Sequence, residues 1–326
     1  MRAVVYEGPG GPEVVKLREV PKPVATGDLL LVKVHASALN RADILQRQGM
    51  YQVPEGQSPI PGVEIAGTVE DWGENVKGFV RGQRVYGVVE GGAFADYCLL
   101  DQGMANPIPE SFGFREAAAT SESFLTANET LFTLGGLQPG HTVLVHAGAS
   151  SIGTTMVQMI KHIGATAYCT VGSQKKVEAL RAIGADEAIL YKEQDFAREV
   201  MRLTRGEGVE LVMDFVGGAY LERNLSLLKH EGCLVVVGLL EGLSAGLDLL
   251  RLVQRRLQIK GSSLRLRPMH EKRQVNAHFR RRWAEVLDRG QLRPVVHAEY
   301  PFERFSEAQA EMESNRNIGK IVLSHG

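Results

Sequence analysis

The chain has 326 residues, with 37 Lys and Arg against 38 Asp and Glu and a formal net charge of -1. At about 150 residues per domain, this length predicts two domains. The balanced charge makes nucleic acid an unlikely partner and gives no attraction to an anionic membrane, so we expect a small-molecule ligand.

No apolar run approaches the ~18 to 20 residues that span a bilayer. The start of the chain also lacks the apolar region of a signal peptide. We therefore expect a cytoplasmic protein without a membrane segment. Cys98, Cys169 and Cys233 are expected to be buried, reduced thiols.

The first part of the chain, to about residue 122, consists of short apolar runs separated by Gly and Pro. This pattern predicts an all-β, partly barrel-like domain. Strands are expected at residues 3–6, 29–37, 67–72, 84–89 and 95–100. A short helix is expected at 40–48, with Asn40 as its N-cap and Asp43 in its first turn.

From about residue 123 apolar strands alternate with amphipathic helices, which is typical of a parallel sheet covered on both faces. We expect strands at 142–146, 165–170, 188–190, 211–214, 233–237 and 258–262, and helices at 153–162, 174–183, 196–203 and 219–228. The mixed tail is expected to end in a strand at 320–324 and to rejoin the first domain. The predicted fold class is α/β, a doubly wound parallel sheet with a second, β-rich domain.

Small residues fill the turn between the first parallel strand and the next helix, Ala147-Gly148-Ala149-Ser150-Ser151-Ile152-Gly153. Such a turn lets a pyrophosphate approach backbone N–H groups and the positive end of the helix, and Gly153 allows close packing of helix on sheet. Ser150 stands where the usual G-x-G-x-x-G pattern has its middle glycine. Because the turn opens a series of βα units, it predicts dinucleotide binding.

The end of the second parallel strand, T-V-G-S-Q-K-K, indicates which nicotinamide cofactor is used. NAD enzymes place an acidic residue there to bind the ribose 2′-hydroxyl, and this chain has none. Ser173, Lys175 and Lys176 instead offer a hydroxyl and two cations to a 2′-phosphate. This composition favours NADP(H).

With several other motifs, these segments make the chain resemble the quinone oxidoreductase branch of the medium-chain dehydrogenase/reductase superfamily, especially its tumour-suppressor-inducible subgroup. The segments are A-S-A-L-N-R-A-D-I-L-Q-R-Q-G-M-Y (36–51), G-V-E-I-A-G (62–67), G-G-A-F-A-D-Y (91–97), H-A-G-A-S-S-I-G-T (146–154), V-G-S-Q-K-K (171–176), V-G-G-A-Y-L-E-R-N (216–224) and N-I-G-K-I-V-L (317–323). The resemblance implies a GroES-like catalytic domain at 1–122 and 267–326 and a Rossmann domain for NADPH at 123–266. It also implies a homodimer or homotetramer, joined through the strand near 258–262.

The resemblance further implies which residues contact the cofactor. They are Asn40, Tyr51, Thr126, Ala149, Ser150, Ser151, Ile152, Gly153, Gly172, Ser173, Lys176, Tyr191, Gly238, Leu239, Ser263 and Lys320. Two segments depart from the family pattern. The phosphate turn has S-S-I-G at 150–153 where S-G-V-G is usual, and residues 118–122 lack the proline of A-A-x-x-P-E.

Zinc alcohol dehydrogenases of the same superfamily bind a catalytic zinc with a Cys and the His of G-H-E. The corresponding positions here are Asn40 and Val63, Glu64 lacks its partners, and three scattered cysteines cannot form a structural zinc site. We therefore expect chemistry without a metal. His35 and His146 are expected to be structural or solvated.

A metal-free site favours a conjugated acceptor, because hydride transfer to a quinone or enone leaves delocalised charge that a few hydrogen-bond donors can stabilise. Tyr51 and Asn40 are the candidate donors, although both could instead only hold the cofactor. Phe124, Leu239 and Leu264 are expected near the acceptor. Arg273 and Arg280 to Arg282 are expected on a solvated helix face.

The first functional hypothesis is an NADPH:quinone oxidoreductase. One alternative is reduction of the carbon–carbon double bond of an enal, enone or enoyl thioester. A further alternative, of another class, is a crystallin-like protein that binds NADPH with little turnover.

Overall fold

A six-stranded parallel sheet forms the centre of residues 126–264 in the computed structural model, which describes residues 1–326. Its strands are β8 (Thr142–Val145), β9 (Thr166–Val171), β10 (Glu187–Leu190), β11 (Val209–Asp214), β12 (Leu228–Val236) and β13 (Gln258–Gly261). Their order is β10-β9-β8-β11-β12-β13, and every neighbouring pair is parallel. Counted along the chain, this is the Rossmann strand order. From β8 the chain adds strands first on one side, β9 and β10, and then on the other, β11 to β13, so the switch point lies between β8 and β11.

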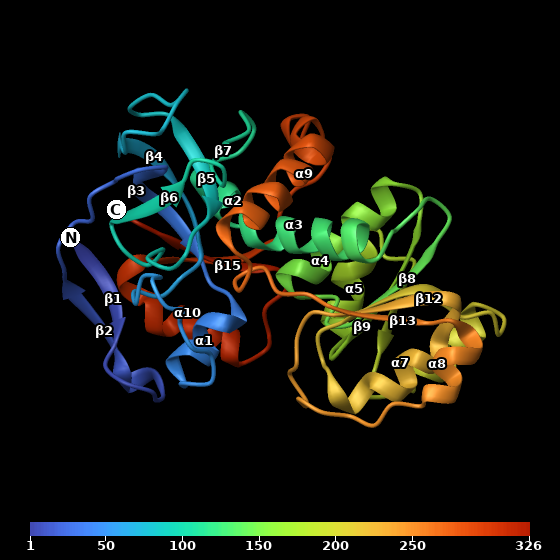
Figure 1. Ribbon diagram of the computed structural model, residues 1–326. Helices are drawn as coiled ribbons and strands as arrows, with labels where there is room; N and C mark the ends of the chain where they lie inside the picture. The colour runs from blue at the N-terminus through green and yellow to red at the C-terminus, as the bar shows by residue number, and fades with distance from the viewer. The chain divides into compact units, whose positions relative to one another are not determined.

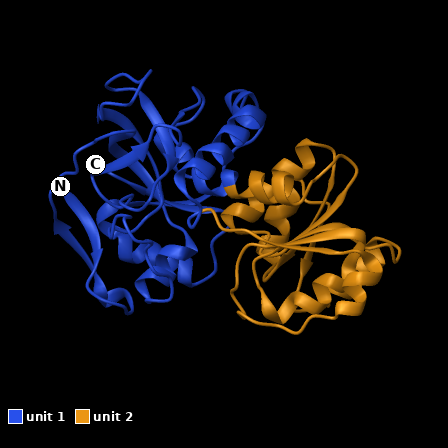
Figure 2. Cartoon of the chain, viewed as in Figure 1, with its two compact units in different colours: residues 1–125, 265–326 blue, residues 126–264 orange.

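Helices connect these strands and cover both faces of the sheet (Figure 1). They are α4 (Ser151–His162), α5 (Gln174–Ala182), α6 (Phe196–Leu203), α7 (Leu221–Leu227) and α8 (Leu249–Arg255). Val143, Leu144 and Val212 on the central strands are fully buried, as expected for strands covered on both sides. We call residues 126–264 unit 2 (Figure 2).

Residues 1–125 and 265–326 form unit 1 (Figure 2), whose strands are antiparallel except for the parallel pair β14 and β15. The strands are β1 (Arg2–Tyr6), β2 (Val15–Glu19), β3 (Leu29–Ala38), β4 (Glu64–Trp72), β5 (Arg84–Val88), β6 (Tyr97–Asp101), β7 (Asn106–Pro107), β14 (Val296–Pro301) and β15 (Lys320–Ser324). The main sheet has the order β14-β15-β3-β4-β5-β7, and β6 also pairs with β3. The helices are α1 (Arg41–Arg47), α2 (Phe114–Ala118), α9 (Met269–Asp288) and α10 (Phe305–Glu313), while α3 (Ser121–Asn128) begins in unit 1 and ends in unit 2.

The long strand β3 organises unit 1 because it pairs along its length with three other strands. β4 pairs with one edge of β3. On the other edge, β6 pairs with residues 29–33 and β15 pairs with residues 36–38. β15 therefore lies beside the end of β3 that leads into α1.

The predicted α/β fold class is confirmed, while several element boundaries were wrong. β4 begins at Glu64 rather than 67, and β12 begins at Leu228 rather than 233. The helix expected at 219–228 is a 3₁₀ turn, Gly218–Tyr220, followed by α7. The sequence interpretation missed β2, β14, α2, α3, α8, α9, α10 and the π-helical turn Glu129–Leu134. None of the helices is both long and apolar enough to cross a membrane.

Candidate cofactor and active site

The turn after β8 has the backbone geometry of an anion-binding cradle. Ala147 adopts a left-handed conformation with φ of 50°, and a Cβ on Gly153 would meet the Gly148 carbonyl oxygen at 2.4 Å. The Oγ of Ser150 caps α4 by accepting the N–H of Gly153 at 3.0 Å. The N–H groups of Ser151 and Ile152 make no hydrogen bond within the chain. These two donors fit a pyrophosphate at the N-terminus of α4.

Ser150 therefore has a structural role that the sequence interpretation lacked. Its backbone is extended, as an N-cap requires, and its hydroxyl satisfies a donor of the first helical turn. The serine at the middle glycine position thus leaves the cradle open.

Residues expected at the 2′-phosphate follow the neighbouring strands β9 and β10. Ser173 is the exposed N-cap of α5, and its side chain makes no capping hydrogen bond. Lys176 lies in the first turn of α5, and Tyr191 directly follows β10 with 41% of its surface exposed. A Cβ on Gly172 would lie 3.2 Å from the Tyr191 hydroxyl and 3.6 Å from Cε of Lys192. The structure thus brings Gly172 and Tyr191 together, and adds Lys192, a cation that the sequence interpretation missed although it adjoins Tyr191.

The other candidate residues of unit 2 mostly follow the carboxyl ends of parallel strands as well. Gly238 and Leu239 follow β12, and Ser263 follows β13. A Cβ on Gly238 would meet the carbonyl oxygen of Phe215, after β11, at 2.9 Å. Ligands of doubly wound sheets bind at this edge. Thr126, within α3, is the exception and is 7% exposed.

In unit 1, Asn40 belongs to a buried polar cluster. Its Oδ1 accepts a hydrogen bond from Nζ of Lys320 at 2.7 Å, and its Nδ2 donates to Oε1 of Glu64 at 2.8 Å. Lys320 and Glu64 form an ion pair of 2.6 Å, with side chains 1% and 0% exposed. The second oxygen of Glu64 accepts the N–H of Glu122 at 2.8 Å. We call Asn40, Glu64, Glu122 and Lys320 the Asn40 cluster.

The strand register explains why these residues meet. Ala38 of β3 pairs with Val322 of the antiparallel strand β15, so Asn40 and Lys320, each two residues further out, lie opposite each other. On the other edge of β3, Ser37 pairs with Ile65, which places Glu64 beside the end of β3. Asn40 is the N-cap of α1 as expected, and its N–H donates to Oδ2 of Asp43 in the first turn at 2.7 Å.

Tyr51 lies beside Arg265, whose guanidinium carbon is 5.1 Å from the centroid of the tyrosine ring. Arg265 also donates to Gln57 at 3.4 Å and to Gln46 at 3.3 Å. Burial raises the pKa of the Tyr51 hydroxyl, and the charge of Arg265 acts in the opposite direction. Tyr51 therefore stays protonated near neutral pH and can donate a hydrogen bond. Arg265 was missed because no local motif marks it.

Four further expectations concern Phe124, Arg273, His146 and the three cysteines. Phe124 is fully buried, and its place near the acceptor stays a prediction. Arg273 is partly exposed, but unlike a freely solvated side chain it is ion-paired with Asp28 at 2.7 Å and Asp101 at 2.6 Å. His146 is structural as expected, since it is fully buried and bonded to Thr170 and Asn224. The three cysteines are buried and free.

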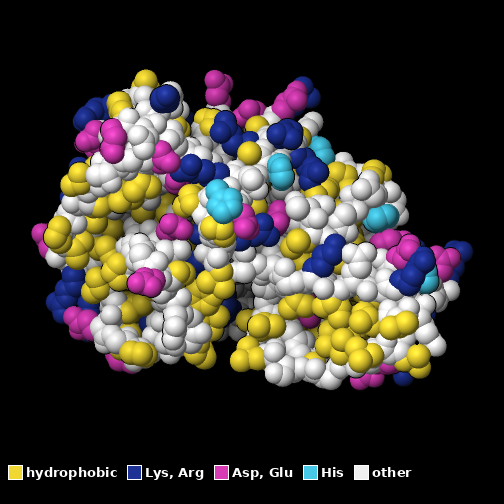
Figure 3. All heavy atoms as spheres, viewed as in Figure 1, with side chains coloured by type: hydrophobic (Ala, Val, Ile, Leu, Met, Phe, Trp, Pro, Cys, Tyr) yellow, Lys and Arg dark blue, Asp and Glu magenta, His cyan; other side chains and the backbone are white.

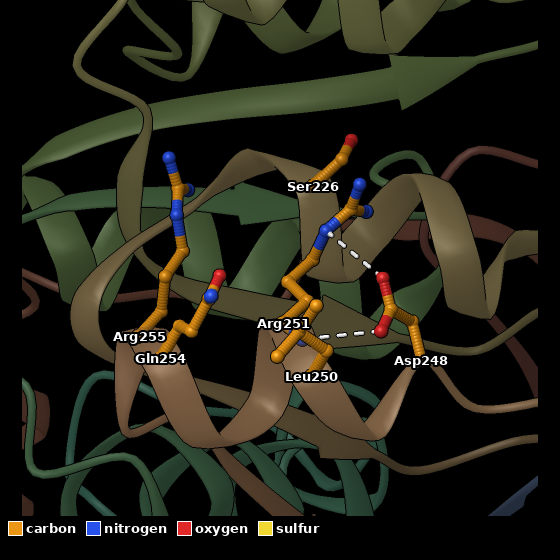
Figure 4. A pocket seen from close by; sticks show the side chains of 6 residues that line it. All are labelled: Ser226, Asp248, Leu250, Arg251, Gln254 and Arg255. Carbon is orange, nitrogen blue, oxygen red and sulfur yellow. Dashed lines mark hydrogen bonds and ion pairs between the residues drawn. The ribbon is translucent and has the colours of Figure 1, made fainter.

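No group of three or more His, Cys, Asp or Glu side chains is arranged to hold a metal ion. Unit 2 has a shallow surface pocket of about 280 Å³ (Figure 4). It is lined by Ser226, Asp248, Leu250, Arg251, Gln254 and Arg255. None of the expected site residues lines it.

Known proteins resemble the chain over nearly its whole length. The model of the alcohol dehydrogenase GroES-like domain matches residues 26–134, and that of the zinc-binding dehydrogenases matches residues 151–280. The human synaptic vesicle membrane protein VAT-1 homolog is 31% identical, over 100% of this chain and 87% of that protein. Mouse quinone oxidoreductase is 29% identical, over 99% of this chain and 97% of that protein.

Among solved structures, the Escherichia coli quinone oxidoreductase complexed with NADPH matches with a TM-score of 0.90 at 27% identity. The match covers 99% of this chain and 100% of that chain. A GroES-like domain joined to a Rossmann sheet, with these relatives, defines a medium-chain dehydrogenase/reductase. The chain belongs to the quinone oxidoreductase type of that family and is an oxidoreductase.

Proposed function

We propose that the protein is an NADPH-dependent quinone oxidoreductase that acts without a metal. The observation that carries the proposal is the pair of neutral hydrogen-bond donors in unit 1, the hydroxyl of Tyr51 and the amide of Asn40. Asn40 occupies the position where zinc relatives have a cysteine ligand. NADPH, when bound, supplies the hydride.

Unit 2 carries the residues proposed to hold the cofactor. The free N–H groups of Ser151 and Ile152 bind the pyrophosphate. Ser173, Lys176 and Tyr191 bind the 2′-phosphate, with Lys192 as an additional cation. The relatives support this choice, because an NADPH complex is known for the Escherichia coli quinone oxidoreductase and for a mycobacterial protein of 28% identity.

Unit 1 carries the residues proposed to act on the acceptor. The Tyr51 hydroxyl and an amide hydrogen of Asn40 donate to the quinone oxygen on which negative charge develops. Fixed donors of this kind stabilise the transition state because they need no reorganisation during the reaction. Two such donors are sufficient to stabilise the delocalised charge on a hydroquinone oxygen.

An acceptor panel tests the proposed function. Stopped-flow measurements would follow NADPH oxidation with ortho- and para-quinones and with enones and enals of similar size. We expect rapid oxidation with quinones and slow oxidation with enones. Faster oxidation with enones would assign a double-bond reductase instead. Tight NADPH binding with no acceptor-dependent oxidation would assign a binding protein and overturn the enzyme proposal.

We also propose that the chain forms a homo-oligomer through β13. This strand is the edge of the parallel sheet, and its Ile259 is 38% exposed. The adjoining helix α8 exposes Leu249, Leu250 and Val253 to 64%, 65% and 72%. Apolar side chains gather over this region of the surface (Figure 3). Pairing with β13 of a second copy would protect this open edge.

A further inference from the structure

We propose that Glu64 and Lys320 are positioning residues that hold the amide of Asn40 in one orientation, so that it offers an N–H donor to the acceptor oxygen. The inference rests on the proposed function, because it assigns the device that makes Asn40 a donor. All the residues concerned belong to unit 1.

The chemistry of the two partners decides the orientation of the amide. An ammonium group can only donate hydrogen bonds, and an ionised carboxylate can only accept them. The amide oxygen must therefore face Lys320, at 2.7 Å, and the amide nitrogen must face Glu64, at 2.8 Å. The flipped amide would place NH₂ against the ammonium and the carbonyl against the carboxylate. Both contacts would be repulsive.

One hydrogen of Asn40 remains available after these bonds are made. Nδ2 carries two hydrogens, and the only hydrogen bond it makes within the chain is to Glu64. Asn40 is half-buried, whereas Glu64 and Lys320 are closed to solvent. We propose that a ligand accepts the second hydrogen. The ammonium on the carbonyl oxygen also polarises the amide and strengthens this donor.

Lys320 acts through Asn40 rather than directly on a ligand. Its side chain is 1% exposed, and its ammonium contacts Asn40 and Glu64, with Glu122 4.0 Å away. Glu64 is in turn fixed by the N–H of Glu122 at the start of α3. The backbone of Asn40 is held separately, because its N–H donates to Oδ2 of Asp43 at 2.7 Å. Residues from β4, α3 and β15 therefore surround the amide.

The kinetic test compares two carboxylate-to-amide changes. Glu64→Gln removes the charge that selects the amide orientation, and we expect kcat to fall about tenfold or more while the Kd for NADPH changes less than about twofold. Asp101→Asn is the matched control, because Asp101 is also buried and ion-paired but contacts Arg273 instead of Asn40. It should lower Tm with little change in kcat. Equal losses of kcat in the two variants would overturn the positioning role.

A second measurement does not depend on activity. In the free protein, NMR of the side-chain amides should give Asn40 two well-separated proton signals, with the one bonded to Glu64 shifted downfield. The pair is assigned by its absence in Asn40→Asp. We expect Glu64→Gln and Lys320→Met to collapse the separation and Asp101→Asn to preserve it.

Unchanged Asn40 signals in Glu64→Gln would overturn the inference even if activity fell. If none of the quinones supported NADPH oxidation by the wild-type protein, the proposed function would fail. The NMR result would still show whether the cluster orients the amide.

Discussion

At the scale of single residues, we propose that the choice of cofactor depends on a few cations after β9 and β10. Lys176→Ala should weaken NADPH binding about tenfold or more, because a charge-assisted hydrogen bond to phosphate is lost. NADH binding should change less than about twofold. Lys16→Ala is the control, since Lys16 is an exposed lysine of equal charge on β2, outside unit 2. Fluorescence titration measures both cofactors. An equal loss for NADPH and NADH would show that Lys176 does not bind the 2′-phosphate.

Asp43 is a buried carboxyl group beside the Asn40 cluster. It is fully buried, its Oδ1 has no hydrogen-bond partner, and its Oδ2 accepts the N–H of Asn40. Burial raises its pKa from 3.8 to about 7, although the Asn40 bond and the charge of Lys320 act to lower it. The folded protein therefore holds a proton on Asp43 at pH values where the unfolded chain has lost it.

This difference predicts how stability depends on pH. Below pH 3.8 the Asp43 contribution is fully present, and it is lost as pH rises through about 7. Asp43→Asn keeps an oxygen for the Asn40 N–H and removes the charge. We expect the variant to gain Tm relative to wild type between pH 5 and pH 8. Thermal unfolding at the two pH values measures this, with the exposed Asp71→Asn as control. A Tm difference that is the same at both pH values would contradict the prediction.

The sequence indicated which residues belong to the candidate site better than it indicated the contacts between them. Asn40 and Tyr51 belong to a continuous motif and were therefore found. Glu64 was interpreted as the remnant of a zinc motif without partners, because its partner Lys320 is brought close only by the pairing of β15 with β3. Arg265 was missed for the same reason. Contacts between distant segments leave no periodic pattern in the sequence.

At the scale of elements, the strand–turn–helix unit of β8 and α4 depends on the close approach of Gly153 to Gly148. Gly153→Ala would place Cβ 2.4 Å from a carbonyl oxygen, so the turn must shift at a cost of about 1 to 3 kcal/mol. We expect lower Tm and weaker binding of NADPH and NADH alike. Gly246→Ala is the control, because no atom lies within 4 Å of its added Cβ. Normal binding of both cofactors by Gly153→Ala would contradict the assigned phosphate turn.

The longest element that the sequence missed, α9, has a mixed buried face. The 20-residue helix α9 buries Val275, Phe279, Trp283 and Leu287 at intervals of one turn, but Lys272 and Asn276 lie on the same face. Lys272 is buried because it pairs with Glu90 at 2.7 Å, and Asn276 bonds to Asn106 at 3.0 Å. A buried lysine interrupts the apolar pattern from which helices are predicted. The parallel strands were found more readily because both of their faces are apolar.

At the scale of the whole molecule, the proposed assembly depends on the open edge of one sheet. Ile259→Lys places a charge on β13 and should convert an oligomer into a species of 35.7 kDa, the mass of one chain. Leu17→Lys is the matched control, because Leu17 is 43% exposed on β2, outside unit 2. Light scattering after size-exclusion chromatography gives the masses. A monomeric wild-type protein would contradict the proposal, as would an oligomeric Ile259→Lys variant.

The pairing of β15 with β3 also determines when the Asn40 cluster is completed during synthesis. Ribosomes add roughly 5 to 20 residues per second, so Lys320 emerges tens of seconds after Asn40 and Glu64. Unit 2 is one continuous segment and is complete earlier, which allows it to fold before the chain is finished. During this interval Glu64 has no counter-ion and the Asn40 amide can turn freely. A nascent chain can thus form its parallel-sheet unit before the residue that we propose orients the Asn40 donor has been synthesised.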